Sequence, residues 1–160
     1  MPPVADGMAE RLILGSMPGR QSLAAGQYYA HPRNVFWRIM GELVGAHPHL
    51  PYAARLQVLQ SARLALWDVL HSCERKGSLD SDIQAETAND FARFFAEHPH
   101  ITHVGFNGAK AEQSFRRLVL GKHPLPPLVL TRLPSTSPAH AGMPYAEKLA
   151  CWRAFIAPRT

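Results

Sequence analysis

The sequence predicts an α/β protein, a three-layer α/β/α sandwich with a central four-stranded parallel sheet. Short apolar runs alternate along the chain with segments of helical periodicity, which is typical of strands joined by crossover helices. The strand candidates are continuous apolar runs and not alternating patterns, as expected of strands buried on both faces. Each strand candidate also runs into a polar loop that contains glycine or proline. Ligands of such sheets bind beyond the carboxyl ends of the strands, so a site is expected among these loops.

Four apolar runs predict the strands, because each is short and is followed by turn-forming residues. They are residues 11–16, 64–70, 103–108 and 127–135. Residues 17–27 are predicted to be a loop from their Gly, Pro and Ser content, and residues 71–83 from their polarity. Residues 1–9 are expected to form a short frayed leader.

The segment after HPRN (residues 31–34) is predicted to be an amphipathic helix. Its apolar positions fall at i, i+3, i+4, i+7 and i+8, which makes one buried stripe of Phe36, Ile39, Met40, Leu43 and Val44. Asn34 stands just before this stripe, where an amide side chain can cap the free N–H groups of the helix. The same position leaves open whether Asn34 also carries chemistry.

Helical spacing predicts further helices over residues 51–62, 89–98, 109–120 and 144–156. The first of these has Pro51 in its first turn, with Tyr52, Leu56 and Leu59 on one face. The second is expected to be capped by Asn89 and to turn Phe91, Phe94 and Phe95 inward. In the last, the residues expected to face the core are Tyr145, Leu149, Trp152 and Ile156.

Length and composition are those of one domain spanning residues 1–160, large enough for a sizeable core. No apolar run approaches the roughly 20 residues that cross a bilayer, and no signal-peptide pattern opens the chain. Two cysteines make no disulfide framework, so a cytoplasmic protein without a membrane partner is expected. The net charge of +5 modestly favours an anionic partner such as nucleic acid, bound on a folded surface because the basic residues are scattered.

The loop at residues 15–22, GSMPGRQS, follows a strand but matches neither a Walker A loop nor a dinucleotide fingerprint. Its glycines, Ser16 and Ser22 could still present N–H and O–H donors to a phosphate or a base. Tyr29, in the loop that follows, could stack on a base at the mouth of a site. The alternatives are a plain Gly-Pro turn and a tyrosine that fills the core.

The loop at residues 133–142, LPSTSPAHAG, holds three hydroxyl residues and a histidine at the end of a strand. Ser135 and Ser137 suit phosphate oxygens, and the prolines fix the loop so that its donors are preorganised. His140 could donate a hydrogen bond to a leaving group that carries negative charge. A turn with a solvated histidine is the alternative.

Two charged residues stand at predicted element ends. Lys110 lies in the first turn of a helix, where backbone N–H groups already favour anions, although a solvated lysine is the default. Asp68 interrupts an apolar strand and could accept from a ring N–H of a base, or cap local backbone. The two HPH triplets match no metal-ligand pattern, and the chain has no G-x-S-x-G elbow, so we expect no metal, no cofactor and no serine hydrolase.

Four of these segments, in this order, resemble motifs of the uracil-DNA glycosylase superfamily. They are LILGSMPG (residues 12–19), QYYAHPRNVFW (27–37), VGFNGAKAEQSF (104–115) and LPSTSPAHA (133–141). The order and spacing are similar to those of the mismatch-specific uracil/thymine glycosylases, and more similar to the hypoxanthine-DNA (DNA-deoxyinosine) glycosylase branch. The resemblance covers residues 11–156 and implies a monofunctional enzyme without a cofactor. Such an enzyme flips a deaminated nucleotide out of DNA and hydrolyses its N-glycosidic bond.

The resemblance also implies roles for single residues of the base pocket. Tyr29 would stack on the flipped base, and Asp68 falls where relatives have an amide that reads the base, with Ser16 beside it. Many relatives hold the attacking water with an Asn or Asp two residues after the first-motif glycine, where this chain has Met17. A thioether cannot orient water. The hypoxanthine branch lacks that amide too, and its catalytic asparagine matches Asn34.

The second motif and the helix start are implied to hold DNA. By position, Ser137, Pro138, Ala139 and His140 would grip phosphate and push into the duplex, with His140 assisting departure of the base or clamping the strand. Ser135 is expected on phosphate as well. Lys110 aligns with a lysine of the mismatch-specific relatives and would also contact phosphate.

Three functions therefore stand open from the sequence. The first is a glycosylase, monomeric by family expectation, for hypoxanthine and then uracil in double-stranded or single-stranded DNA. The second is a binding module of the same fold that recognises damaged or single-stranded DNA without cleavage, Met17 marking the lost activity. The third is a hydrolase of free nucleosides or nucleotides, against which the duplex-wedge motif argues.

Overall fold

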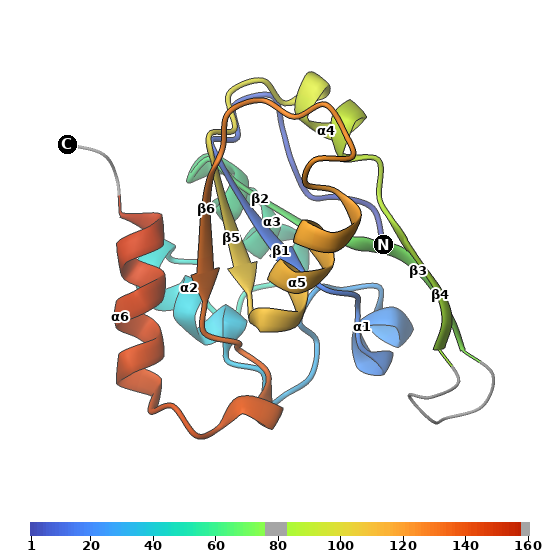
Figure 1. Ribbon diagram of the computed structural model, residues 1–160. Coiled ribbons are helices and arrows are strands. Elements are labelled where there is room, and N and C mark those ends of the chain that lie inside the picture. Colours follow the sequence, from blue (N-terminus) through green and yellow to red (C-terminus); the bar gives the residue numbers. More distant parts are fainter. Residues whose placement is uncertain (76–82, 158–160) are drawn as a thin grey trace.

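The computed structural model describes residues 1–75 and 83–157 and places a four-stranded parallel sheet at the centre of the molecule (Figure 1). The strand order is β2-β1-β5-β6. The strands are β1 (Arg11–Gly15), β2 (Leu64–Asp68), β5 (His103–Asn107) and β6 (Val129–Leu133). All neighbours in this sheet are parallel, so the four carboxyl ends meet at one edge. The four predicted strands and the parallel sheet are confirmed.

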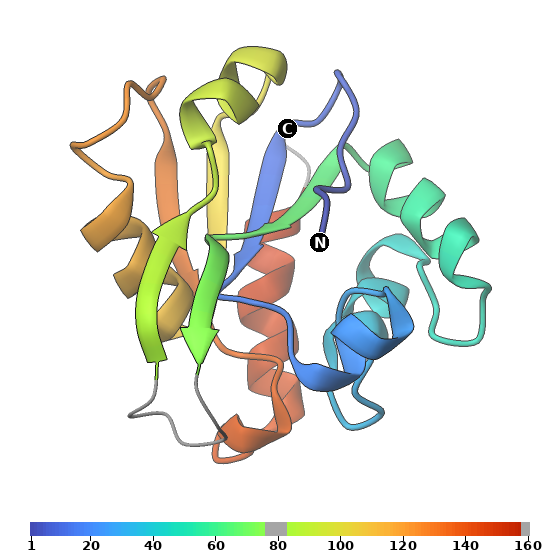
Figure 2. The ribbon, with the colours of Figure 1, turned by 90° about the vertical axis from the view of Figure 1, so that its right-hand side faces the viewer.

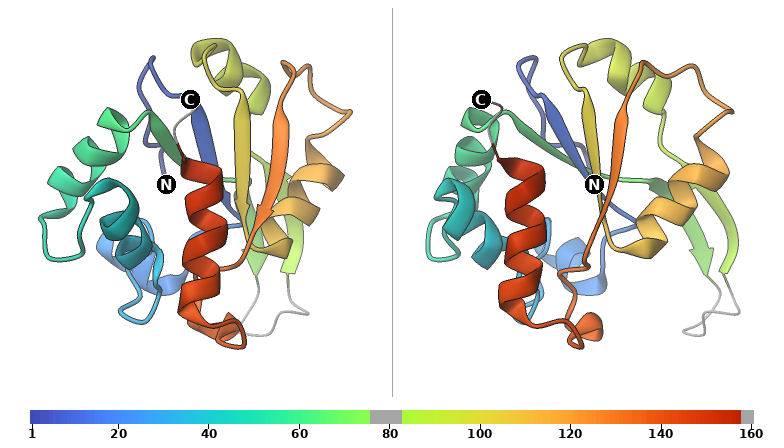
Figure 3. Two further views of the ribbon diagram at one scale, coloured as in Figure 1. Left: turned by 90° about the vertical axis from the view of Figure 1, so that its left-hand side faces the viewer. Right: turned by 60° about the vertical axis from the view of Figure 1, so that its left-hand side comes forward.

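Helices cover both faces of the sheet, which confirms the three-layer sandwich (Figure 3). They are α1 (Arg20–Ala25), α2 (Phe36–Val44), α3 (Tyr52–Ser61), α4 (Phe91–Glu97), α5 (Ala109–Leu118) and α6 (Tyr145–Ile156), with a 3-10 turn at Pro138–His140. One core lies between the sheet and α4 with α5, and a second lies between the sheet and α2, α3 with α6. Strand β1 serves both, because Leu12 and Leu14 point into the first core and Ile13 into the second.

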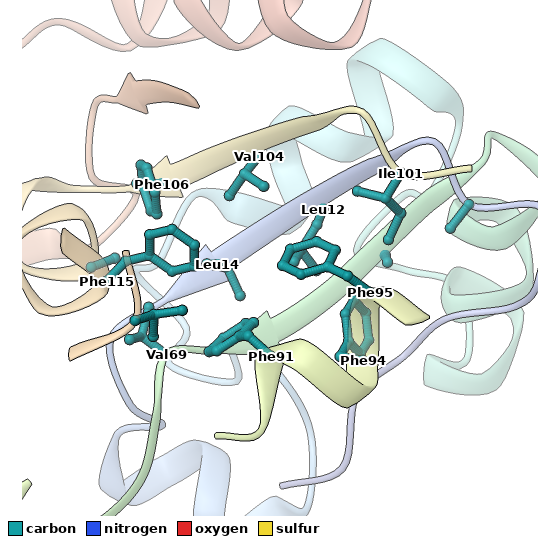
Figure 4. Close-up of a cluster of buried hydrophobic side chains, with 14 of the residues drawn as sticks. Leu12, Leu14, Val69, Phe91, Phe94, Phe95, Ile101, Val104, Phe106 and Phe115 are labelled. Carbon is teal, nitrogen blue, oxygen red and sulfur yellow. The ribbon is translucent and has the colours of Figure 1, made fainter. Parts of the chain in front are cut away.

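The helical stripes place these layers. The predicted phenylalanines of α4 are all buried in the first core, where they pack with Phe106 and Phe115 (Figure 4). In α2, Phe36, Ile39 and Met40 are fully buried, and Leu43 with Val44 packs at the edge of the second core.

An antiparallel hairpin, β3 (Leu70–Arg75) and β4 (Ile83–Ala88), leaves the domain beside the carboxyl edge of the sheet (Figure 2). The segment was expected to be a polar loop, and that prediction is wrong for the described part; residues 76–82 lie outside the described residues. A two-stranded ribbon beside the domain is not buried on both faces and needs no continuous apolar run. Its polar sequence was therefore interpreted as a loop. Glu86 of β4 anchors the ribbon to α5 through ion pairs with Lys110 and Arg117.

Other local predictions also need correction. Residues 20–25 of the expected loop form α1, and the expected frayed leader pairs with the sheet, since Val4 and Leu66 exchange backbone hydrogen bonds at 2.9 Å. The cap of α4 is Asp90, which accepts from the Arg93 N–H at 3.1 Å. Asn89 instead donates to the Asp68 carbonyl oxygen at 2.7 Å.

The buried face of α6 is rotated from the prediction. Its buried residues are Lys148, Trp152 and Phe155, whereas Tyr145, Leu149 and Ile156 are half-buried. Phe155 can pack closely on β5 because residue 105 is glycine: a Cβ there would lie 2.7 Å from Phe155 Cζ. Among the described residues, no helix is both long enough and apolar enough to cross a membrane.

Candidate active site

A pocket of about 560 Å³ lies where β1, β2, β5 and β6 end, between α1, the start of α2 and the loop after β6. The parallel topology makes this place, because each strand delivers its following loop to the same edge. The predicted site residues that line it are Ser16, Ser22, Tyr29, Asn34, Asp68, Ser135, Ser137 and Pro138. Met17, on the first loop, lines it as well.

Three predicted site residues do not line the pocket. Lys110 lies on the surface with Nζ 3.2 Å from Glu86 Oε2, so its ammonium forms an ion pair with the hairpin. Ala139 and His140 are exposed and continue the loop beyond Pro138. A role for these residues in holding DNA outside the pocket stays a prediction.

Asn34 reaches the pocket from the turn before α2. Its Oδ1 accepts from the Phe36 N–H at 3.0 Å, so the side chain binds the first free N–H of α2 in a local turn, while the N-cap position itself is Val35 and has no side-chain cap. The adjacent Val35 N–H donates to the Thr136 carbonyl oxygen at 3.0 Å, which fixes this turn against the loop after β6. A carbonyl oxygen has two lone pairs, so Oδ1 can still accept from a water molecule, and Nδ2 keeps its donors for a ligand.

Asp68 ends β2 and carries a buried carboxyl group that is 4% exposed. Its Oδ2 has no hydrogen-bond partner among the described residues. Burial raises the pKa of Asp68 to about 6, because the ionised form loses its hydration. An unpaired carboxylate in such a place costs free energy, and a ligand N–H would supply the missing donor.

The Tyr29 hydroxyl is a second buried polar atom near Asp68 and Gly15. It also lacks a hydrogen-bond partner among the described residues, and burial, with the nearby Asp68 charge, raises the pKa of Tyr29. A Cβ at Gly15 would lie 2.7 Å from Asp68 Oδ1 and 3.2 Å from the Tyr29 hydroxyl, so any other residue there would push these side chains out of place. One face of the Tyr29 ring stacks on Phe36 at 4.1 Å, the Tyr28 ring lies 6.2 Å away, and Tyr29 lines the pocket.

Asn107, at the end of β5, is a pocket residue that sequence reasoning missed. Its Nδ2 donates to Thr136 Oγ1 at 3.0 Å, and its Oδ1 accepts from the Thr136 N–H at 2.9 Å. This reciprocal pair ties the loop after β6 to the sheet. The available signal was an amide at a strand end in GFNG, which reads equally well as a turn residue.

The serines of the site bind the protein's own backbone. Ser22 is buried and accepts from the Ala30 N–H at 3.1 Å, which shapes the loop around Tyr29. Ser135 Oγ accepts from the Ser137 N–H, and Ser137 Oγ from the Ala139 N–H, both at 3.2 Å. In these bonds the hydroxyl oxygens are acceptors. Each hydroxyl proton therefore stays available to donate to a phosphate oxygen.

Comparison with known proteins agrees with this geometry. The family model of the uracil DNA glycosylase superfamily matches residues 2–156. Hypoxanthine DNA glycosylase from Methanosarcina barkeri is 40% identical over 111 residues, which are 69% of this chain and 70% of the relative. The protein of the same name from Methanosarcina acetivorans gives the same values.

A solved structure extends the likeness to nearly the whole chain. It is the solution NMR structure of a protein from Methanosarcina acetivorans described as a candidate uracil DNA glycosylase. The two structures superpose with a TM-score of 0.78 at 34% identity, covering 97% of this chain and 93% of the other.

Proposed function

The chain belongs to the uracil DNA glycosylase superfamily, and we propose that it is a monofunctional DNA glycosylase that removes deaminated bases, hypoxanthine first, and leaves an abasic site. The observation that carries the choice of base is the 40% identity to hypoxanthine DNA glycosylases. The pocket at the carboxyl edge gives that activity a place, because two of its lining residues, Tyr29 and Asp68, carry a buried polar atom without a hydrogen-bond partner among the described residues. A module that binds DNA without cleaving it is not favoured.

The proposed chemistry needs only a placed water and a stabilised leaving group. As the bond from C1′ to the base nitrogen breaks, its electron pair leaves with the base and positive charge grows on the sugar. The water oxygen then bonds to C1′ and its proton is lost to solvent or to the departing base. Asn34 Oδ1 orients the water, which requires no strong base because the sugar cation is a powerful electrophile.

The polar groups of the pocket account for recognition of hypoxanthine. The unpartnered Asp68 Oδ2 accepts from the N1–H of the flipped base, an atom that adenine lacks. Tyr29, which lines the pocket, stacks on the base, and Ser16 donates to a base oxygen. Ser135 and Ser137, with Pro138 between the strands, hold the flanking backbone, and His140 clamps the strand outside the pocket.

Duplex oligonucleotides that carry hypoxanthine or uracil test the activity directly. The wild type is expected to leave alkali-labile abasic sites, hypoxanthine being removed faster, and Asn34→Ala is expected to leave none on the same timescale. Gln57→Ala, an exposed amide on α3, is the matched control. Intact bases at enzyme excess would rule out the enzyme, and wild-type cleavage by Asn34→Ala would rule out the role given to that residue.

The finer properties of the enzyme are proposals as well. We expect a monomer that works in the cytoplasm on double-stranded DNA and accepts single strands. Sedimentation at working concentration, and excision from matched single-stranded and duplex substrates, check these points.

A further inference from the structure

Helix α6 directs a lysine to its buried face, behind the loop that closes the pocket. Lys148 is 5% exposed, and its Nζ donates to the His140 carbonyl oxygen at 2.8 Å. One turn later, the fully buried Trp152 donates from Nε1 to the Pro134 carbonyl oxygen at 3.0 Å. Since residues four apart lie on one helix face, α6 holds both ends of the segment 134–140.

Residues beside the pocket hold the same segment through hydrogen bonds to its middle. Thr136, at its middle, is bound by both polar atoms of the Asn107 side chain, through its hydroxyl and its backbone N–H. Its carbonyl oxygen accepts from the Val35 N–H. The segment 134–140 is therefore fixed at both ends by α6 and in its middle by β5 and the start of α2. Figure 1 shows this stretch running beneath the sheet from β6 to α6. It is ordered before any DNA arrives.

The charge of Lys148 has no counter-ion among residues 1–75 and 83–157. Among the described residues, no carboxylate lies within ion-pair distance of Nζ, and burial alone lowers the pKa of Lys148. A buried cation normally has a paired anion, because its lost hydration is otherwise uncompensated. Lysine carries three N–H donors, and the His140 carbonyl oxygen takes one of them. A methionine of similar shape would fill the same space without that cost.

We propose that Lys148 is a positioning residue for DNA, and that its ammonium is the counter-charge for a backbone phosphate held on the segment 134–140. Lys148 and Trp152 set the shape of the segment. The DNA phosphate supplies the negative charge that no described carboxylate provides for Lys148. The inference rests on the proposed function, since the phosphate is that of a DNA substrate. Ser135 and Ser137 belong to the same segment, and their hydroxyls accept from backbone N–H groups, so each keeps a proton to donate to that phosphate.

The test compares Lys148→Gln, Lys148→Met and Lys148→Arg with wild type, using a fluorescent duplex that contains hypoxanthine. Kd is measured from about 50 to 300 mM salt, and single-turnover excision is measured at saturating enzyme. Lys122→Met is the matched control, because Lys122 is exposed in the turn after α5, at the opposite edge of the sheet. Lys148→Gln removes the charge and offers an N–H donor on a side chain one bond shorter.

We expect Lys148→Gln and Lys148→Met to raise Kd about tenfold at low salt. The slope of log Kd against log salt should fall by about one, the amount that one phosphate contact contributes. The single-turnover rate at saturating enzyme should fall less than the affinity does, because saturation offsets the weaker binding and the segment keeps its bonds to Trp152 and Asn107. Lys148→Arg should keep the wild-type slope, and Lys122→Met should behave as wild type.

Folded Lys148→Gln with wild-type Kd and slope would overturn the inference. A weaker Kd with an unchanged slope would overturn it too, since that result means loop packing without a phosphate. If Lys148→Met does not fold, Lys148→Gln decides. A wild type that neither binds nor excises would instead be a failure of the proposed function.

Discussion

At the residue scale, Asn34 holds the start of α2 and faces the pocket with one side chain. The two uses can be separated, because a serine hydroxyl can also accept from the N–H two residues on, but serine carries no amide to present to a ligand. We expect Asn34→Ser and Asn34→Ala each to slow hypoxanthine excision by about a hundredfold or more. Only Asn34→Ala should also lose about 1 kcal/mol of unfolding free energy.

Single-turnover excision and urea unfolding of the two variants measure these effects separately. Wild-type excision by Asn34→Ser would mean that Asn34 binds the Phe36 N–H and does nothing more. Spacing alone predicted that Asn34 binds a free N–H of the helix, which it does at Phe36 although Val35 is the N-cap, whereas the chemical role depends on the family resemblance and on the amide missing at Met17.

Asp68 gives stability a pH dependence of unusual sign. Burial raises the pKa of its carboxyl group from 3.8 to about 6, so the folded protein takes up this proton before the unfolded chain does. The ionised form destabilises the fold, fully above pH 6 and not at all below pH 4. We expect Asp68→Asn to exceed wild type by up to about 3 kcal/mol at pH 7.5 and to converge with it near pH 4, from about two pKa units at 1.4 kcal/mol each.

Urea unfolding of wild type and Asp68→Asn between pH 4 and 8 checks this expectation. The difference between the two proteins isolates Asp68, because Glu86 and Glu112, whose pKa values are lowered, act equally in both. Glu97→Gln, an exposed acid on α4, is the control and should show no such convergence. A constant difference across this range would contradict the shifted titration. The sequence marked Asp68 as unusual because it interrupts an apolar run, but it left open a local backbone cap, and only the fold shows that the carboxyl group is buried.

At the element scale, the order of strands and helices could be read from apolar runs, because buried strands and helical stripes leave strong patterns. The hairpin β3–β4 could not, since a ribbon outside the core has no such pattern, and its anchor at Glu86 joins it to residues of α5 far along the chain. The buried face of α6 was misplaced for a related reason. Lys148 is inside through a hydrogen bond to a distant carbonyl oxygen, which hydrophobic periodicity cannot register.

The junction of β5 with the loop after β6 depends on Asn107. Asn107→Ala removes both bonds to Thr136, and Thr136 is only 1% exposed, so its N–H and hydroxyl would be left unpaired. We expect a loss of about 2–3 kcal/mol of unfolding free energy. Excision should fall as well, since the loop that lines the pocket loses its middle support.

Thr136→Val separates the two bonds, because it keeps the backbone N–H for Asn107 Oδ1 and removes the hydroxyl. It should cost less than Asn107→Ala, about 1–2 kcal/mol, in the same urea titrations. Equal stability of Asn107→Ala and wild type would show that the junction does not need this pair.

At the scale of the whole molecule, charge and pocket should act on DNA independently. The net charge of +5 and the proposed phosphate contacts would act on any duplex, whereas the proposed base pocket would act only on a flipped base. Plots of log Kd against log salt should therefore be parallel for hypoxanthine-containing and undamaged duplexes of one length. Their vertical offset is the free energy of placing the lesion in the pocket, measured with Asn34→Ala to prevent turnover.

Adding Asp68→Asn to this variant should shrink the offset between the two plots and keep their slope. Adding Lys148→Gln should lower the slopes of both plots together. Lines that diverge for the two duplexes would mean that base flipping itself recruits new phosphate contacts, so that the fixed loop at 134–140 is not the whole of the DNA-binding surface.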